Sequence, residues 1–223
     1  MRMRRKKHLS ERLDACRGIV TSYWPEELAF SVWEDGSDRL DLSAVFGNDH
    51  PIEMEIGCGK GSFICELAQR RPQTNFIAVE KSESALVIAC ERASALGLKN
   101  VHFISTDAEY LPRILPLAFT GRIYLNFSCP FPKKRYASHR LTHPHFLDRY
   151  RRWLIPGGEI VQKTDDADLF AFSLVSLSGA GFVLQDVSLD LEHSDVEGNI
   201  VTEYESRFVA MGKPIYYLRA TMK

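Results

Sequence analysis

The feature that most limits the fold of this chain is a glycine-rich turn between an apolar segment and a helix-length segment. Residues 52–56 are short and mostly apolar, Glu55 lies near their end, and Gly57, Gly59 and Gly61 follow at alternate positions. Glycine lets a backbone turn sharply and approach a ligand with no Cβ in the way. The pattern predicts a strand, a tight turn and a helix, with either a ligand site or a plain βα connection at the turn.

The alternation of apolar runs and helix-length segments continues to the end of the chain. Strands are expected over residues 52–56, 75–79, 101–105, 121–126, 159–163, 182–189 and 214–220, and helices over 60–71, 83–96, 142–154 and 167–178. Strands joined by helical crossovers form a mostly parallel sheet. We therefore expect a Rossmann-like, doubly wound α/β sheet of seven strands over residues 51–223. Residues 1–50 show no clear period and are expected to be a basic N-terminal extension wrapped on this domain.

The composition is that of an ordinary globular chain. Of the 223 residues, 45% are hydrophobic and 26% are charged, which suits one α/β domain. No apolar run is long enough to cross a bilayer. The five cysteines are odd in number and lack the spacing of metal ligands. The sequence therefore predicts a cytoplasmic protein with reduced thiols, no membrane contact and no bound metal.

The formal net charge of −1 hides two basic blocks. Residues 1–12 contain six Arg or Lys side chains against one Glu, and residues 133–140 contain four against no acid. Basic blocks in a near-neutral protein are typical of a surface that binds a polyanion such as RNA. The alternative is that both blocks are ordinary solvated surface.

Three acidic side chains are expected at the edge of the sheet where such folds bind ligands. Glu55 precedes the first glycine, Glu80 ends the second predicted strand, and Asp107, followed by Ala108, comes after the third. A carboxylate before the turn would repel a pyrophosphate, but it suits a cationic ligand that bears hydroxyl groups, such as S-adenosyl-L-methionine. We expect Glu80 to accept from the ribose hydroxyls and Asp107 to accept from the adenine amino group.

A proline-containing loop follows the fourth predicted strand. Asn126 ends that strand, and residues 128–132 read Ser-Cys-Pro-Phe-Pro. This is a loose version of the polar-Pro-Pro-aromatic loop of methyltransferases that act on ring or exocyclic nitrogens. Prolines stiffen such a loop, and an aromatic ring stacks on a base. The loop therefore favours a nucleobase substrate, with a plain turn as the alternative.

Together these motifs resemble the bacterial tRNA (guanine-N7)-methyltransferases, the family that modifies the guanine at position 46 in the variable loop. The resemblance runs from residue 45 to the C-terminus and includes the basic start at residues 1–4. Its most specific parts are Tyr124-Leu125-Asn126-Phe127, Pro132-Lys133-Lys134-Arg135, Lys163-Thr164-Asp165, and Thr202-Glu203-Tyr204-Glu205 with Gly212. It implies a class I methyltransferase fold, S-adenosyl-L-methionine as cofactor, S-adenosyl-L-homocysteine as product, and methyl transfer to N7 of a tRNA guanosine.

The resemblance also implies which residues bind each ligand. The cofactor residues are Glu55, Gly57, Gly59, Gly61, Glu80, Lys81, Asp107, Ala108 and Asn126. The guanosine residues are Lys133, Asp165, Thr202, Glu203, Tyr204 and Glu205, and the RNA-contacting residues are Arg135, Tyr136, Ala137, Ser138, His139 and Arg140. The likeness to Gram-positive members is compatible with a homodimer.

The chain departs from the family motif at three positions. It has Cys129 where the family has an Asp that is usually called catalytic, Phe131 where the family has Trp, and Tyr136 where it has His. Guanine N7 carries an in-plane lone pair and no proton, so it can attack a sulfonium methyl group without a general base. Asp165 and Glu205 are then expected to hold the guanine edge and stabilise its charge. Cys129, by its position, and Asp165 are the candidate catalytic residues.

Three alternatives remain open on the residues alone. The chain can be an impaired homologue that binds tRNA or cofactor without turnover, or a methyltransferase for another nucleobase or small molecule. Cys129 can also act as a thiolate nucleophile, as in cytosine C5-methyltransferases, with Lys133 four positions away to activate it. The residues around Cys129 match the guanine-N7 family instead. Methyl transfer to unmodified tRNA, followed by nucleoside analysis, separates these cases.

Overall fold

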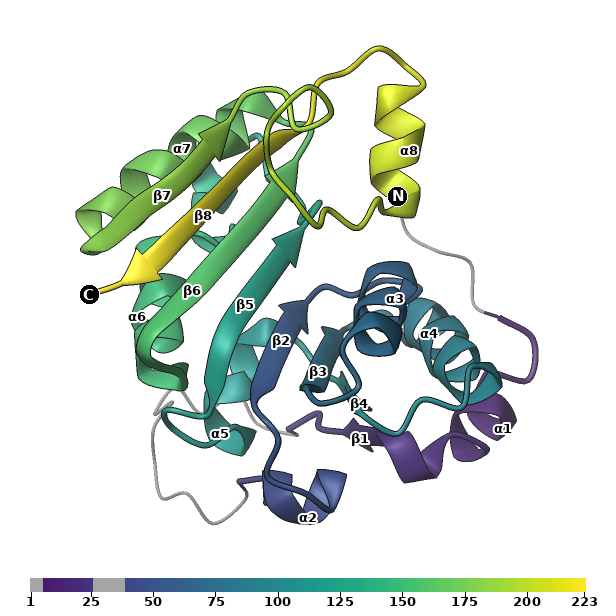
Figure 1. Cartoon of the computed structure of the whole chain (residues 1–223). Coiled ribbons are helices and arrows are strands. Elements are labelled where there is room, and N and C mark those ends of the chain that lie inside the picture. The colour runs from purple at the N-terminus through teal and green to yellow at the C-terminus, as the bar shows by residue number, and fades with distance from the viewer. Residues whose placement is uncertain (1–5, 26–38) are drawn as a thin grey trace. The chain divides into compact units, whose positions relative to one another are not determined.

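The computed structural model describes residues 6–25 and 39–223, and the chain divides into two compact units. The first unit extends to Pro116 and the second begins at Leu117 (Figure 1). Each unit contains its own strands and its own covering helices. No helix in the described parts of the chain is long and apolar enough to cross a membrane.

The first unit contains four strands in the order β1-β4-β3-β2. Their bounds are β1 (Val20–Ser22), β2 (Ile52–Ile56), β3 (Asn75–Glu80) and β4 (Val101–Ser105). The pairs β1–β4, β3–β4 and β2–β3 are all parallel. Met54, Phe76, Ile77 and Phe103 are fully buried. Nearly continuous burial along β2, β3 and β4 is typical of parallel strands that are covered on both faces.

The helices of the first unit are α1 (Leu9–Asp14), α2 (Leu42–Phe46), α3 (Ser62–Arg70), α4 (Glu83–Ala95) and α5 (Leu111–Ile114). The helices α3 and α4 lie where the sequence predicts helices over 60–71 and 83–96. Figure 1 shows α3 beside α4 and α1 on the other side of α4. Cys65 and Ala89, one from each of α3 and α4, are buried at this contact.

The N-terminal segment supplies a strand that the sequence does not predict. The guanidinium of Arg12 donates to both carboxylate oxygens of Glu91 on α4, at 2.6 and 2.7 Å. Farther along the segment, Thr21 Oγ1 lies 2.9 Å from His102 Nε2, which joins β1 to β4. The described residues therefore contain eight strands and not the seven expected, because a strand of three residues is too short to give a period.

The second unit contains four strands in the order β5-β6-β8-β7. Their bounds are β5 (Thr120–Asn126), β6 (Leu154–Thr164), β7 (Phe182–Ser188) and β8 (Tyr216–Met222). The pair β5–β6 is parallel, whereas β8 runs antiparallel to both β6 and β7. The helices are α6 (Pro144–Trp153), α7 (Ala167–Gly179) and α8 (Glu203–Val209). The predicted α/β class with mostly parallel strands is confirmed.

Two elements of the second unit differ from expectation. The strand β6 begins at Leu154, so the Pro-Gly-Gly of residues 156–158 lies within the strand and not in a turn before it. The sequence pattern predicts no element over residues 203–209, where the structure has the helix α8. It begins with a capping box, in which the side chains of Thr202 and Glu205 each bond the other's backbone N–H. Thr-x-x-Glu is a helix-start signature.

Candidate active site

The glycine turn of the first unit has the conformation that its residues require. Gly57, Gly59 and Gly61 have φ values of 85°, 55° and 74°, which only glycine adopts without strain. The N–H of Gly57 donates to the carbonyl of Val79 at 2.8 Å, which fastens the turn to β3. A Cβ on Gly61 would lie 2.7 Å from the Ala89 Cβ, whereas nothing lies within 4 Å of the same position on Gly57 or Gly59. Gly61 is therefore required for the packing of α3 against α4, whereas the backbone at Gly57 and Gly59 borders empty space that a ligand can occupy.

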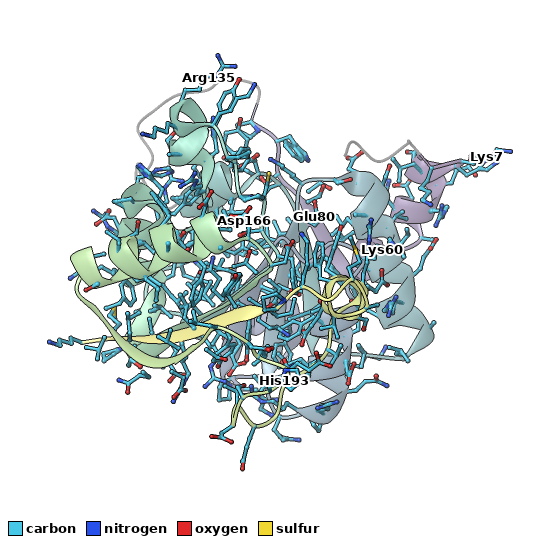
Figure 2. The ribbon with its side chains drawn as sticks, turned by 90° about the horizontal axis from the view of Figure 1, so that it is seen from above. Lys7, Lys60, Glu80, Arg135, Asp166 and His193 are labelled. Atoms are coloured by element: carbon cyan, nitrogen blue, oxygen red, sulfur yellow. The ribbon has the colours of Figure 1, made fainter. Side chains whose placement is uncertain are left out.

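Glu80, at the end of β3, holds the turn through its carboxylate. One oxygen accepts from the N–H of Gly59 at 3.0 Å, and the other accepts from the N–H of Ser82 at 2.7 Å. Figure 2 shows Glu80 together with Lys60, which belongs to the glycine turn. A carboxylate oxygen accepts more than one hydrogen bond, so Glu80 keeps acceptor capacity for a ligand. The sequence predicts the ligand role of Glu80 but not this bracing role.

Glu55 lies in β2 just before the turn and is only 2% exposed. The neighbouring Cys58 is also buried, and burial, followed by the negative charge of Glu55, raises the pKa of its thiol well above the usual value. Cys58 therefore stays a neutral thiol, which is a poor nucleophile and a poor metal ligand.

Asp107 follows β4 and begins a short 3-10 helix at Ala108. Its Oδ1 accepts from the N–H of Glu109 at 3.1 Å, and its Oδ2 accepts from Lys81 Nζ at 3.3 Å. Strand register places Glu55 beside Ala78 and Glu80 beside Ser105. Glu55, Glu80 and Asp107 therefore lie along one edge of the first unit, at the carboxyl ends of neighbouring strands, as the sequence predicts.

An aromatic pair stands at the same edge. Trp24 is 46% exposed, and its ring meets that of Tyr110 edge-on, with centroids 6.4 Å apart. The indole N–H of Trp24 points to Ser105 Oγ at 3.4 Å, and the N–H of Tyr23 donates to the Ser105 carbonyl at 3.0 Å. Sequence reasoning misses Trp24, because residues 1–50 give no period from which to place it.

In the second unit, the end of β5 leads into a cluster of stacked rings. Asn126 is buried, and Phe127 follows it with φ of 50°. The Phe127 ring stacks on Tyr204 and Phe208 of α8, with centroids 6.0 and 5.8 Å away. These three residues form the aromatic cluster. Tyr204 remains 55% exposed, so much of its ring is open to solvent.

Asp165 comes directly after β6, as predicted. Its Oδ2 accepts from Lys213 Nζ at 3.1 Å, and its side chain is partly exposed. The Lys213 ammonium also lies 5.0 Å from the centroid of Phe208. The next residue, Asp166, has a different task, since its carboxylate caps α7 by accepting from the N–H of Leu169 at 2.7 Å (Figure 2). Asp165 is therefore the acid of this segment that can meet a ligand.

The sequence predicts that Thr202 and Glu205 contact the guanosine, whereas the structure places both inside the start of α8. Thr202 is buried, and Glu205 is 4% exposed. Glu205 pairs with the buried Lys163 at 2.8 Å. Two members of the same predicted set, Glu203 and Tyr204, are exposed on the helix. The motif thus divides into a buried half and an exposed half.

The loop after β5 presents most of its charges outward. Cys129 is exposed, as are Lys133, Lys134, Arg135 and Tyr136, and Figure 2 shows Arg135 projecting from the end of this segment. The Arg135 guanidinium lies 4.8 Å from the centroid of the Tyr136 ring. Ser138 and His139 are also exposed, and Ala137 is half-buried. The loop is therefore an exposed cationic surface.

Arg140 differs from the other cations of the loop. Its guanidinium donates to the carbonyl oxygens of Pro130 and Phe131, at 3.0 and 3.1 Å, and lies 4.5 Å from the centroid of the Phe172 ring. The sequence predicts that Arg140 contacts RNA, but these bonds engage it in holding the loop.

The N-terminal basic block is only partly described. Lys6 and Lys7 are exposed, and Figure 2 shows Lys7 pointing away from the first unit. Arg2, Arg4 and Arg5 lie outside the described residues. Within residues 6–25 and 39–223, no group of three or more His, Cys, Asp or Glu side chains is arranged to hold a metal ion.

Solved structures share the fold at low sequence identity. A 16S rRNA methyltransferase, KamB, superimposes with a TM-score of 0.62 over 84% of this chain and 95% of its own, at 17% identity. A SAM-dependent methyltransferase from Aquifex aeolicus gives a TM-score of 0.56 over 98% of this chain and 100% of its own, at 15% identity. These likenesses confirm the predicted Rossmann-like fold of class I methyltransferases.

Sequence relatives are much closer. The model of a family described as "Putative methyltransferase" matches residues 49–218. The tRNA (guanine-N(7)-)-methyltransferase of Listeria monocytogenes serotype 4a is 43% identical over 99% of this chain and 98% of its own length. The proteins of the same name from Lachnoclostridium phytofermentans and Bacillus subtilis are 48% and 45% identical, over 79% and 78% of this chain and 83% and 82% of theirs. The chain therefore belongs to the family of bacterial tRNA (guanine-N(7)-)-methyltransferases.

Proposed function

We propose that this protein transfers a methyl group from S-adenosyl-L-methionine to N7 of a guanosine in tRNA, at position 46 of the variable loop. The observation that carries the proposal is the open glycine turn, braced by Glu80, in a chain of this family. A tRNA substrate also implies a cytoplasmic enzyme.

The residues of the first unit fit the cofactor. Gly57 and Gly59 leave space where a Cβ would otherwise stand, and the carboxylates of Glu55, Glu80 and Asp107 line the same edge. Such a site suits a ligand with a cationic end, ribose hydroxyls and an amino group. When bound, S-adenosyl-L-methionine supplies an electrophilic methyl group on a sulfonium. Glu80 would hold the ribose, and Asp107 the adenine, with Lys81 and Ala108 as further contacts.

The second unit offers residues for the guanosine. Guanine N7 is already a nucleophile, so the protein has to orient the base and stabilise the positive charge that the purine acquires. Tyr204 has an exposed ring on which the base would stack, and Asp165 has a partly exposed carboxylate that matches the N1–H and N2–H donors of guanine. Lys133 and Glu203 are exposed and complete this proposed set. The thiol of Cys129 is exposed but brings no carboxylate.

The exposed cations of the loop after β5 are proposed to bind tRNA phosphates. Lys134 and Arg135 have no acid in their segment, and the ring of Tyr136 supports the Arg135 guanidinium. Lys6 and Lys7 would add a second set of contacts. Arg140 contributes indirectly, because it holds the loop by its bonds to two carbonyl oxygens.

The decisive experiment is transfer of a tritiated methyl group to unmodified tRNA, followed by nucleoside digestion and mass detection. We expect 7-methylguanosine as the product. Asp165→Asn keeps the size of the side chain but turns an acceptor into a donor. It should lower kcat/KM by about tenfold to a few hundredfold, with unchanged cofactor affinity. The matched control is Asp168→Asn, which changes an exposed acid in the first turn of the nearby helix α7.

Variants at position 129 separate the alternatives. Cys129→Ala should leave methylation unchanged, because N7 attack needs no thiolate. A methylated cytosine that disappears in Cys129→Ala would establish the thiolate mechanism instead. Binding of tRNA without turnover, with activity gained in Cys129→Asp, would mark an impaired homologue. Either result would contradict the proposal.

A further inference from the structure

A buried ion pair ties the end of β6 to the start of α8. Lys163 and Glu205 are 2% and 4% exposed, and Lys163 Nζ lies 2.8 Å from Glu205 Oε2. We propose that Lys163 is a positioning residue, which fixes α8 so that Tyr204 presents its ring to the guanosine. Glu205 then acts on α8 and does not contact the base. The inference rests on the proposed function, because it names a residue that positions the substrate.

The ammonium of Lys163 reaches more of the segment than Glu205 alone. It also donates to the carbonyl oxygen of Ile200 at 2.8 Å and to Oδ1 of Asn199 at 2.9 Å. Residues 199–205 therefore converge on one cation from three points. The side chain of Lys163, on β6, thus holds the segment that leads into α8, and we call its three bonds to Asn199, Ile200 and Glu205 the clamp.

The carboxylate of Glu205 is engaged inside the protein on both oxygens. Oε1 accepts from Asn199 Nδ2 at 2.6 Å, and Oε2 accepts from the N–H of Thr202 at 3.3 Å in addition to Lys163. The N–H of Glu205 in turn donates to Thr202 Oγ1 at 3.0 Å. A buried charge is tolerated only while it is paired and hydrogen-bonded. Because both oxygens bond groups of the protein, the role of the Glu205 carboxylate is structural.

Lys163 holds both sides of the aromatic cluster. Its carbonyl oxygen accepts from the N–H of Phe127 at 2.8 Å, while its ammonium holds Glu205, the neighbour of Tyr204. Phe127 and Tyr204 stack with centroids 6.0 Å apart. One residue therefore sets the positions of a ring on the loop after β5 and of a ring on α8.

The helix α8 has only seven residues, so it depends on such support. An isolated helix of this length is not stable in water. If the ammonium of Lys163 were removed, Glu205 would be left buried without its cation, and the segment would have to move to hydrate it. Tyr204 would then lose its place against Phe127.

The test compares Lys163→Met with Glu205→Gln. Lys163→Met removes the cation and keeps the length of the side chain, and it should lower kcat/KM for tRNA on the order of 100-fold. Glu205→Gln keeps an oxygen that accepts from Lys163 and keeps the capping box, but it leaves the buried ammonium without its carboxylate, so we expect a loss of about tenfold, smaller than that of Lys163→Met. Affinity for S-adenosyl-L-homocysteine should hardly change in either variant. Lys99→Met, which removes an exposed cation of the first unit, is the control.

Hydrogen exchange supplies a second readout that does not depend on turnover. Amide exchange in residues 199–209 should rise in Lys163→Met and should rise less in Glu205→Gln. If Lys163→Met does not fold, Asn199→Ala removes one arm of the clamp and should give a smaller loss of activity with a smaller rise in exchange.

Three outcomes would overturn the inference. A severe loss in Glu205→Gln with unchanged exchange would show that Glu205 contacts the base. Wild-type kcat/KM in Lys163→Met would show that the clamp has no role in catalysis, and unchanged exchange in that variant would show that the clamp does not fix α8. If wild-type protein makes no 7-methylguanosine, the proposed function fails, but the exchange data still test the clamp.

Discussion

The two units form the edges that we propose as ligand sites in different ways. In the first unit the edge consists of a turn, residues 57–61, and of acids at the ends of neighbouring strands, held mainly by backbone N–H groups. In the second unit the edge is assembled from side chains far apart in the sequence, such as Lys163 and Glu205, which are 42 positions apart. A site built from backbone is disrupted when a substitution strains the turn. A site built from side chains is disrupted when one partner of a bond is removed.

The largest effect that tests this contrast is expected at Gly61. Gly61→Ala places a Cβ 2.7 Å from that of Ala89 and also requires a left-handed alanine. Overpacking and backbone strain together should lower the free energy of unfolding by about 2–5 kcal/mol. Gly59→Ala has the strain without the clash and should cost only about 1–2 kcal/mol. Urea denaturation measures both, and equal losses would show that packing at Gly61 is irrelevant.

Glu80→Ala tests whether the braced turn is also the cofactor site. The change removes the acceptor of the Gly59 and Ser82 N–H groups and the proposed acceptor of the ribose hydroxyls. Calorimetry should show that affinity for S-adenosyl-L-homocysteine falls by about 1.5–3 kcal/mol. Glu80→Gln keeps one oxygen and should lose less. Unchanged affinity in Glu80→Ala would place the cofactor elsewhere.

The same contrast explains which parts of the site are readable in the sequence. The turn at Gly57 to Gly61 and the acids Glu80 and Asp107 follow from local pattern, because a parallel sheet brings the ends of its strands to one edge. The bracing bonds from Gly59 and Ser82 to Glu80 are not readable, because they depend on the side-chain conformation at the end of β3.

In the second unit local pattern is a weaker guide. Thr202 and Glu205 form a helix-start signature, yet the family resemblance assigns them to the substrate, and only the fold shows that they are buried. Asn199 and Lys163 meet across 36 positions, and no sequence period links them. In the sequence, Arg140 cannot be distinguished from the other cations of its basic block. The structure distinguishes it by its bonds to two carbonyl oxygens.

Acid should weaken the first unit before the second. Burial lowers the pKa of His102 from 6.5 to about 4. The stability that a neutral His102 contributes is fully present above pH 6.5 and is lost as the pH falls towards 4, by about 2 kcal/mol at pH 5. Hydrogen exchange at pH 5 should therefore rise first in β1 and β4, which His102 joins through Thr21.

His102→Gln removes this titration and should reduce the loss of stability between pH 7 and pH 5. His193 is the control, because its hydrogen bond with Asp190 raises its pKa, so protonation of His193 favours the folded state. His193→Gln should leave the acid sensitivity at least as large as in wild type. A wild-type acid profile in His102→Gln would show that another group is responsible.

The smallest expected effect separates the cations that we propose to bind RNA from Arg140, which holds the loop. Lys134 and Arg135 are exposed, so replacing both by Ala should remove phosphate contacts without affecting the free energy of unfolding. Each lost contact should flatten the log–log salt dependence of tRNA binding by roughly 0.7–0.9. Arg140→Gln removes the bonds to Pro130 and Phe131 and should loosen the loop, seen as faster amide exchange, with little change in the salt slope. If the double variant binds tRNA with wild-type salt dependence, Lys134 and Arg135 are solvated surface, and the phosphate contacts come from other cations such as Lys6 and Lys7.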